Sequence, residues 1–399
     1  MSKSIIICLD GTWNGPDEKD PAGAATPTNV QQLFEGLSGS GPLAPTANEQ
    51  EVTFADEHGT VLQAAKYIHG VGDASNVLAH EVQGAFGLGL IGRIVRGYTY
   101  LSRMYQPGDL IYVVGFSRGA YTARALAGFV VGKGLLNWSA MNLAASSPSS
   151  YIAGIAAWQQ YKAALHSDEP GLLHTLAGYV TDISDRLAIG TARVPPLQFS
   201  ASVPIATVAV WETVGALGIP DIQAGDGTLV RKDLFEFADT ALSPAVSQGL
   251  HAVAVDEQRV DFTPTLWDTR GGVVQVLFPG AHADVGGGYA PNESGLANGA
   301  LAWMATRLSA AGVLLANFVA PPPNPLDIAH QPWVGTPYAT ALREFPTTLQ
   351  LSVRVLQRVA GGAVAVQGAA SQLYRPPNLL NGYLKPDWSG PIENVQVAS

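Results

Sequence analysis

The stretch 109–128 constrains the fold of this chain more than any other part of its 399 residues. An apolar, β-branched run at 110–114 is typical of a buried strand. A G-x-S-x-G string follows at 115–119, and the small apolar residues of 120–131 then favour a helix. This order predicts a tight turn between strand and helix that holds the Ser117 hydroxyl out above a sheet. The two glycines would let the strand and the helix pack closely around it.

A G-x-S-x-G turn between a strand and a helix is the nucleophile elbow of α/β-hydrolases. The alternative is that Ser117 only caps the following helix. Apolar runs also occur at 5–9, 65–69, 204–211 and 273–278, the last of which is the last central strand that the pattern predicts. Helical patterns, such as those at 91–105 and 300–314, alternate with these runs. We therefore predict an α/β, α/β-hydrolase-like fold, with a mostly parallel central sheet and helices on both faces.

Residues 137–200 interrupt this alternation. They indicate two or three helices, around 153–165 and 172–187, with Pro148 and Pro170 as breakers. We predict a helical cap here, with an ordinary insertion that gates nothing as the alternative. The predicted domains are a first part of the hydrolase core at 1–136, the helical insertion at 137–200, a second part of the core at 201–320, and a C-terminal extension packed on the core at 321–399.

Composition excludes several classes of protein. A hydrophobic content of 47% with 14% charged residues is that of a globular chain. The net charge of −10 argues against a nucleic-acid partner and disfavours attachment to anionic lipid by charge alone. Cys8 is the one cysteine, so no internal disulfide is possible. The apolar run at 5–9 is too short for a signal peptide and ends at Asp10, and 134–161 is a poor transmembrane candidate, so we expect a cytoplasmic protein where it is synthesised.

A serine nucleophile needs a base, and the base needs a carboxylate to orient it. In this fold the chain order is serine, acid, histidine. Three histidines follow residue 200. His282 lies just past the last predicted strand, where the base is expected, whereas His251 falls in a predicted helix at 244–254 and is expected to support the site. His330 lies beyond a proline-rich break and is the weakest candidate.

Glu212 directly follows the strand 204–211 and is the predicted acid, because triad acids commonly follow a strand of the sheet. Four aspartates remain alternatives: Asp221, Asp256, Asp268 and Asp284. Of these, Asp256 and Asp284 could also support the site without being the acid.

An oxyanion hole needs two preorganised N–H donors. The backbone N–H of Arg118 is the predicted first donor, and the loop that contains Gly11 and Thr12 is the predicted source of the second. Asp10 could support this loop or hydrogen-bond a partner such as Asn29. Three tryptophans could line an apolar acyl pocket or simply fill the core: Trp13, Trp138 and Trp158.

Several stretches of the chain resemble one large family, first catalogued as an uncharacterised α/β-hydrolase domain. Its bacterial members include phospholipase effectors of type VI secretion. The most specific stretches are GFSRGAYTAR (115–124) and GAHADVGGGY (280–289), and LDGTWN (9–14) and WETVGALGIP (211–220) add to them. The resemblance implies a serine esterase or lipase with Ser117 as nucleophile and His282 as base. The family more often has aspartate where this chain has Glu212.

These observations favour hydrolysis of a carboxylic ester in a lipid or a smaller substrate, without a cofactor. A metal-dependent phosphoester hydrolase that uses Asp10, His282 and Asp284 is one alternative. A non-catalytic binding protein on a hydrolase scaffold is another. Transient contact with a membrane surface is expected for a lipase, whereas the sequence gives no support for a secretion or immunity partner.

Overall fold

The structure is a computed structural model that describes residues 2–11, 25–44, 49–70, 82–145, 147–165, 196–200, 202–214, 222–223, 229–230, 240–336, 338–379, 383 and 397–398. A nine-stranded sheet lies at its centre, in the order β13-β10-β9-β8-β5-β4-β1-β3-β2. Its strands are β1 (Ser4–Leu9), β2 (Glu49–Ala55), β3 (Val61–Ile68), β4 (Leu110–Phe116), β5 (Ile205–Trp211), β8 (Val246–Ala254), β9 (Val273–Phe278), β10 (Gln350–Ser352) and β13 (Val397–Ala398). All neighbours are parallel except the edge pair β2–β3.

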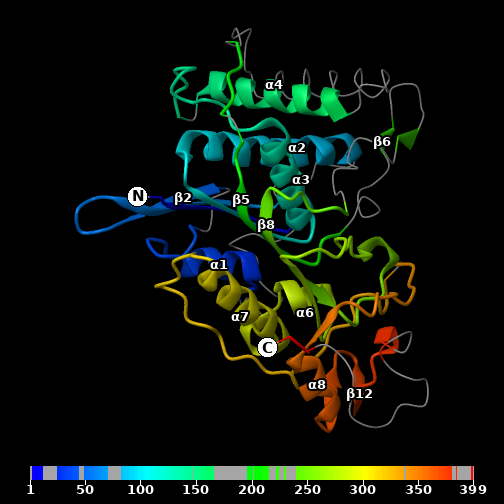
Figure 1. The fold of residues 1–399 in the computed structure, drawn as a ribbon. Coiled ribbons are helices and arrows are strands. Elements are labelled where there is room, and N and C mark those ends of the chain that lie inside the picture. Colours follow the sequence, from blue (N-terminus) through cyan, green and yellow to red (C-terminus); the bar gives the residue numbers. More distant parts are fainter. Residues whose placement is uncertain are drawn as a thin grey trace.

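Helices cover both faces of this sheet (Figure 1). On one face lie α2 (Val82–Met104) and α3 (Arg118–Lys133), and on the other lie α1 (Asn29–Gly36) and α7 (Gly295–Ala310). Alternate residues of β1 enter the two cores, with Ile5 and Ile7 on the α3 side and Ile6 and Cys8 on the α1 side. Burial on both faces explains why the central strands are apolar throughout. The predicted α/β-hydrolase-like class is confirmed.

Smaller elements complete the described chain. The short helix α6 (His282–Gly286) follows β9, and α8 (Val353–Ala360) follows β10. Two-stranded sheets pair β6 (Ile222–Gln223) with β7 (Leu229–Val230) and β11 (Ala363–Val366) with β12 (Ala369–Leu373). Single 3₁₀ turns occur at Val260–Phe262, Pro291–Glu293 and Pro377–Leu379.

The insertion contributes α4 (Pro148–Leu165), which packs on α2 and α3 and forms an outer layer above them in Figure 1. Pro148, predicted as a breaker, begins this helix, where its missing N–H costs no hydrogen bond. The predicted helix at 172–187 lies outside the described residues. None of the described helices has the length and apolar content needed to cross a bilayer.

Three strand predictions were wrong. The segment 244–254 is largely β8 and not a helix, because its apolar part is too short for its periodicity to distinguish the two. The edge strand β2, whose alternating exposed positions carry Glu51, was not predicted, because it lies outside the apolar runs. The sheet also continues past β9 into β10 and β13, which are too short to give a periodic pattern.

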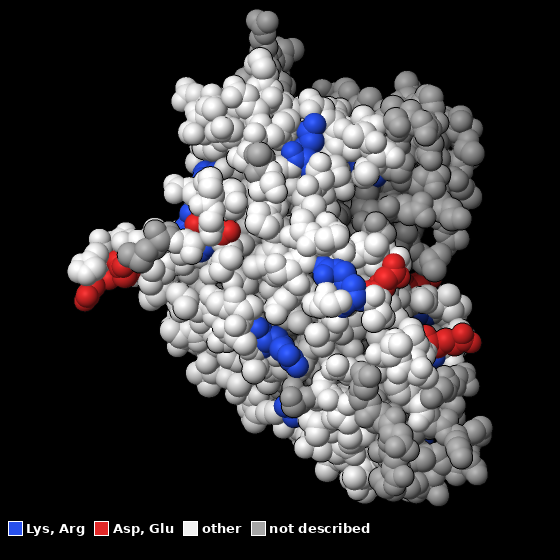
Figure 2. Space-filling view, viewed as in Figure 1, with Lys and Arg blue, Asp and Glu red and all other residues white. Residues whose placement is uncertain are grey.

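Charged groups are sparse on the face drawn in Figure 2, where uncharged atoms cover most of the described surface. Acidic atoms gather at the tip of the hairpin that joins β2 and β3, which projects to the left of the view. Asp56 and Glu57 lie in the turn of this hairpin. The basic side chains on this face are scattered and do not form a continuous patch.

Candidate active site

Ser117 lies in the turn between β4 and α3 with φ 57° and ψ −124°. Its hydroxyl makes no hydrogen bond that would cap α3, so the interpretation of Ser117 as a simple helix cap was wrong. A β-carbon on Gly115 would lie 2.4 Å from the Gly119 carbonyl oxygen, and one on Gly119 would lie 2.1 Å from the Leu9 carbonyl oxygen. Only glycines therefore permit this turn, with the end of β1 directly beside it.

The sheet brings three sequence-predicted residues to one edge. The Ser117 N–H donates to the Trp211 carbonyl at 3.1 Å, so Ser117 and Glu212 follow the carboxyl ends of the neighbouring strands β4 and β5. His282 begins α6, shortly after the carboxyl end of β9. The imidazole lies between two aromatic rings, with centroids of Phe116 and Phe262 each 4.8 Å from its own.

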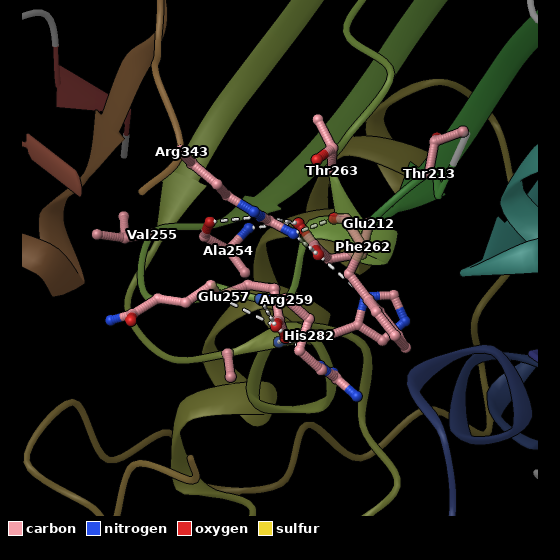
Figure 3. Close-up of polar contacts among 12 residues, drawn as sticks. Glu212, Thr213, Ala254, Val255, Glu257, Arg259, Phe262, Thr263, His282 and Arg343 are labelled. Atoms are coloured by element: carbon pink, nitrogen blue, oxygen red, sulfur yellow. Dashed lines mark hydrogen bonds and ion pairs between the residues drawn. The ribbon is translucent and has the colours of Figure 1, made fainter. Parts of the chain in front are cut away.

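The imidazole of His282 contacts a buried carboxylate (Figure 3). His282 Nδ1 lies 2.9 Å from Glu212 Oε2. A carboxylate only accepts hydrogen bonds, so Nδ1 carries the hydrogen and Nε2 keeps its lone pair. Burial lowers the pKa of His282 more than Glu212 raises it, so the ring is neutral at neutral pH and suited to accept a proton.

Glu212 is 1% exposed and is held at both oxygens. Arg343 donates to Oε1 from Nη1 at 3.0 Å and to Oε2 from Nη2 at 2.9 Å, and the Ala254 N–H donates to Oε1 at 2.7 Å. Burial alone would raise the pKa of Glu212, but the Arg343 guanidinium and the His282 hydrogen bond hold it well below its usual range. The carboxylate is therefore ionised at neutral pH.

The other candidate acids have different partners. Asp256 accepts from the Gly280 N–H and the Tyr374 hydroxyl, and Asp268 accepts from Thr240. Asp284 Oδ1 lies 2.6 Å from His330 Nδ1. Asp221 lies outside the described residues.

Comparisons with known proteins show the family to which the chain belongs. A family model described as "T6SS, Phospholipase effector Tle1-like, catalytic domain" matches residues 3–307. The chain belongs to this family. A relative in Saccharomyces cerevisiae, the uncharacterized protein YEL023C, is 26% identical over 261 residues, which are 65% of this chain and 32% of that protein.

Two solved structures are also similar to this Tle1-like chain. An uncharacterized protein from Pseudomonas aeruginosa shares 16% identity over 80% of this chain and 49% of that chain, with a TM-score of 0.43. The Tle1 effector bound to the VgrG spike from the Type 6 secretion system shares 18% identity over 74% and 52%, with a TM-score of 0.35. This chain spans about a third of the yeast relative and about half of each solved chain.

Asp10 and Gly11, the described part of the predicted oxyanion loop, follow β1 beside the elbow. The Gly11 N–H donates to Asp10 Oδ1 at 2.7 Å, and Thr12 lies outside the described residues. The other carboxylate oxygen of Asp10 accepts from Thr28 Oγ1 at 2.8 Å and from the Tyr67 hydroxyl at 2.6 Å. Asp10 therefore ties β1 to its neighbours.

Asn29 is not a partner of Asp10. Its amide donates to the carbonyls of Val285 and Ala297, which ties the start of α1 to α6 and α7. Arg118 is the first residue of α3, so its backbone N–H follows the nucleophile as predicted for an oxyanion donor. Burial and the nearby Arg93 lower the pKa of the Arg118 side chain to about 10.

His251 supports the acid from β8. Its Nε2 accepts from the Thr213 N–H at 3.2 Å, which fixes the residue after Glu212. Its Nδ1 therefore donates to Gln275 Oε1 at 3.4 Å. Burial, followed by the charge of Arg124, lowers the pKa of His251 to about 3, so this ring stays neutral.

The alternative prediction of a metal site used Asp10, His282 and Asp284 as ligands. Among the residues that the structure describes, no three His, Cys, Asp or Glu side chains are grouped so that they could hold a metal ion. Asp10, His282 and Asp284 each bind other protein groups instead.

Sequence reasoning missed three contributors to the surroundings of His282. Glu257 accepts from the His282 backbone N–H at 3.1 Å, Phe262 contacts its ring, and Arg343 binds its acid. Glu257 follows the strand β8 within a few residues, so its position after a strand end is the signal that could have found it. Arg343 lies in an irregular segment that carries no periodic signal.

The three tryptophans predicted to line an acyl pocket or fill the core differ in their surroundings. Trp158 is 1% exposed and packs edge-on against Phe129 with ring centroids 5.1 Å apart, so it fills the core under α4. Trp138 lines a separate cavity of about 310 Å³ between β2, α2 and α4. Trp13 lies outside the described residues.

Proposed function

We propose that this chain is a lipolytic serine hydrolase that cleaves carboxylic esters through an acyl-enzyme on Ser117, with glycerophospholipid as the leading substrate. The observation that carries the proposal is the buried His282–Glu212 pair at the strand ends beside the elbow. The phospholipase description of the family supports the substrate class. A smaller lipid or soluble ester is the alternative substrate.

In the proposed reaction, His282 Nε2 takes the hydroxyl proton as Ser117 Oγ attacks the ester carbonyl. Ionised Glu212 stabilises the imidazolium that forms. The imidazolium then gives this proton to the leaving alcohol, a lysophospholipid if the substrate is a diacyl phospholipid, and the acyl group stays on Ser117. A water molecule attacks the acyl-enzyme, with His282 again as base, and releases the fatty acid. No cofactor enters these steps.

The oxyanion would be held by the Arg118 N–H and by a second donor from the loop after β1. Losing one such donor typically costs on the order of 10²–10³ in rate. Since the Gly11 N–H is engaged by Asp10, this donor would have to come from further along the loop, at Thr12, or from Gly11 after a rearrangement.

The organisation of the chain also enters the proposal. The hydrolase core would consist of 1–136 and 201–320, with 137–200 as a cap and 321–399 as an extension that packs on the core.

The related Tle1 effector is bound to a VgrG spike in its solved structure. We propose that this chain is exported with a similar partner, which co-purification of the chain with a VgrG spike would test. With a net charge of −10 and scattered basic groups, contact with a membrane would be transient.

Fatty-acid release from phosphatidylethanolamine–phosphatidylglycerol vesicles and hydrolysis of p-nitrophenyl butyrate test this function. We expect wild type to act on both, and Ser117→Ala, with an unchanged melting temperature, to act on neither. Activity on the soluble ester alone would retain the serine mechanism and remove membrane lipid as substrate. Equal activity of both proteins, especially if EDTA abolished it, would contradict the serine mechanism.

A further inference from the structure

We infer that Arg343, which lies beyond the family match at 3–307, is a positioning residue that completes the active site by fixing the Glu212 carboxylate. The inference rests on the proposed function, because it assigns Arg343 to the same Ser117–His282–Glu212 machinery. It gives the C-terminal segment a part in catalysis.

Arg343 is built into the site and is not a surface cation. The residue is 6% exposed. Besides both oxygens of Glu212, its guanidinium binds the Ala254 carbonyl at 2.8 Å and the Phe262 carbonyl at 2.5 Å. One side chain thus ties together the acid after β5, the end of β8 and the turn whose phenyl ring contacts His282 (Figure 3).

The backbone of the segment that carries Arg343 is fixed on the core from both sides. Thr340 forms a β-bridge with Arg259, and the Ala341 N–H donates to the Gln258 carbonyl at 2.9 Å. The Arg343 N–H donates to Asn378 Oδ1 at 3.2 Å. The Asn378 amide in turn donates to the carbonyls of Val255 and Glu257, at 2.6 and 3.1 Å. The guanidinium is therefore delivered by segments that follow the family domain in the sequence.

The two parallel hydrogen bonds to Glu212 have a geometric effect. A bidentate arginine fixes the plane of the carboxylate, so Oε2 stays in line with His282 Nδ1. Glu212 needs such a restraint more than an aspartate would, because its side chain has one more rotatable bond. Its backbone φ of 48° also shows that the residue is held in an unfavourable conformation.

The guanidinium also has an electrostatic effect. The charged or titratable groups around the His282–Glu212 pair are Glu257 and Arg259 after β8, His251 on β8, Arg124 on α3, and Arg343. Arg343 neutralises Glu212, so removing it would leave an unbalanced carboxylate beside the imidazole. The pKa of the pair would then rise, so the imidazole would become neutral, and able to act as base, only at higher pH.

The rate at which a fluorophosphonate labels Ser117, followed from pH 4 to pH 9, tests this inference without knowledge of the natural substrate. Three variants are compared with wild type at equal folded fraction: Arg343→Gln, Arg343→Lys and Arg358→Gln. Arg358 is the matched control, because it is also a buried arginine of the C-terminal segment but binds the carbonyls of Pro325 and Asp327 and not Glu212.

For Arg343→Gln we expect a labelling rate about 100-fold below wild type, the order of loss that misplacement by 1 Å can cause. We also expect the acid limb of its pH–rate profile, where the labelling rate rises with pH, to move to higher pH. Arg343→Lys keeps the charge but cannot bind both oxygens in the same way, so its limb should stay near that of wild type while its rate recovers only in part. Arg358→Gln should change neither quantity.

A wild-type rate and acid limb in Arg343→Gln would overturn the inference while Ser117-dependent labelling upheld the proposed function. Equal losses in Arg343→Gln and Arg358→Gln, with no movement of the limb, would also overturn it by showing a purely structural role. A wild-type protein that is not labelled at Ser117 would overturn the proposed function and this inference together.

Discussion

At the scale of the residue, Ser117 occupies a backbone conformation that side chains rarely adopt. Its φ of 57° with ψ of −124° lies in a region that is readily open only to glycine. The conformation persists because Ser117 is hydrogen-bonded to Trp211 and lies between two glycines packed against backbone atoms. The surrounding fold therefore holds the hydroxyl at the end of β4 against an unfavourable local energy.

This strain predicts an unusual order of stability. Ser117→Gly should be more stable to unfolding than Ser117→Ala by about 1 kcal/mol, because glycine relieves a conformation that costs about 1–3 kcal/mol. Glycine is normally the less stable of the two. Both variants should be inactive. Urea unfolding followed by tryptophan fluorescence measures the difference, and an alanine variant at least as stable as the glycine variant would show that the turn is not strained.

At the scale of the element, the start of α3 packs against the end of β1 without room for a side chain. Gly119→Ala would place its β-carbon 2.1 Å from the Leu9 carbonyl oxygen and 2.5 Å from that of Asp10. Backbone atoms cannot move aside as a side-chain tip can, so we expect a loss of about 3 kcal/mol in the free energy of unfolding. The displaced elbow should also lose most of its esterase activity.

Gly92→Ala is the matched control for this change. Gly92 also lies in a helix, α2, but the nearest atom to its added β-carbon is the Tyr151 hydroxyl at 3.3 Å. Alanine should be neutral or stabilising there by up to about 1 kcal/mol, through its higher helix propensity. Similar losses for both variants in thermal unfolding would contradict the argument from the β1–α3 contact.

Asp256, which follows the end of β8, is a titratable group whose protonation should affect the free energy of unfolding. Burial raises the pKa of Asp256 to about 6, although Gly280 and Tyr374 donate hydrogen bonds to it. A raised carboxyl pKa contributes stability that is complete below the unfolded value near 4 and is lost as pH rises through 6. The stability of wild type relative to Asp256→Asn should therefore fall by about 2 kcal/mol between pH 4 and pH 7. Parallel pH curves for the two proteins would contradict this.

At the scale of the whole molecule, the C-terminal segment is tied to α6, which carries His282. His330 Nδ1 lies 2.6 Å from Asp284 Oδ1, and the His330 ring stacks on Tyr289 with centroids 3.4 Å apart. Burial would lower the pKa of His330, but Asp284 raises it by more. A histidine with a raised pKa contributes stability below its unfolded value near 6.5 and loses it as pH rises through the folded value.

His330→Gln should consequently destabilise the protein more in acid than in base. We expect a loss of about 2 kcal/mol at pH 5, the order of a hydrogen bond to a charged group. The loss should shrink as pH rises above 6.5. Unfolding free energies at pH 5 and pH 8.5 test this, and a loss that grew with pH would show that His330 is held neutral.

The parts of the molecule that sequence could predict are those that local pattern determines. The strand, glycine pair and helix around Ser117 are encoded in consecutive residues, and Glu212 and His282 could be placed because parallel strands end on one edge. Arg343 could not be placed, because its contact with Glu212 joins residues 131 positions apart through an irregular segment. The short strands β10 and β13 were not predicted for a similar reason, because only pairing with a neighbouring strand defines them, β10 with β9 and β13 with β10.

The central claim is that Ser117 is the nucleophile that His282 activates. Its most direct test is to treat wild type with a fluorophosphonate and locate the adduct by peptide mass spectrometry, with His282→Ala and Ser117→Ala alongside. The account predicts one adduct, on Ser117, which forms much more slowly in His282→Ala and is absent from Ser117→Ala. An adduct on another residue, or an unchanged labelling rate without His282, would contradict the account.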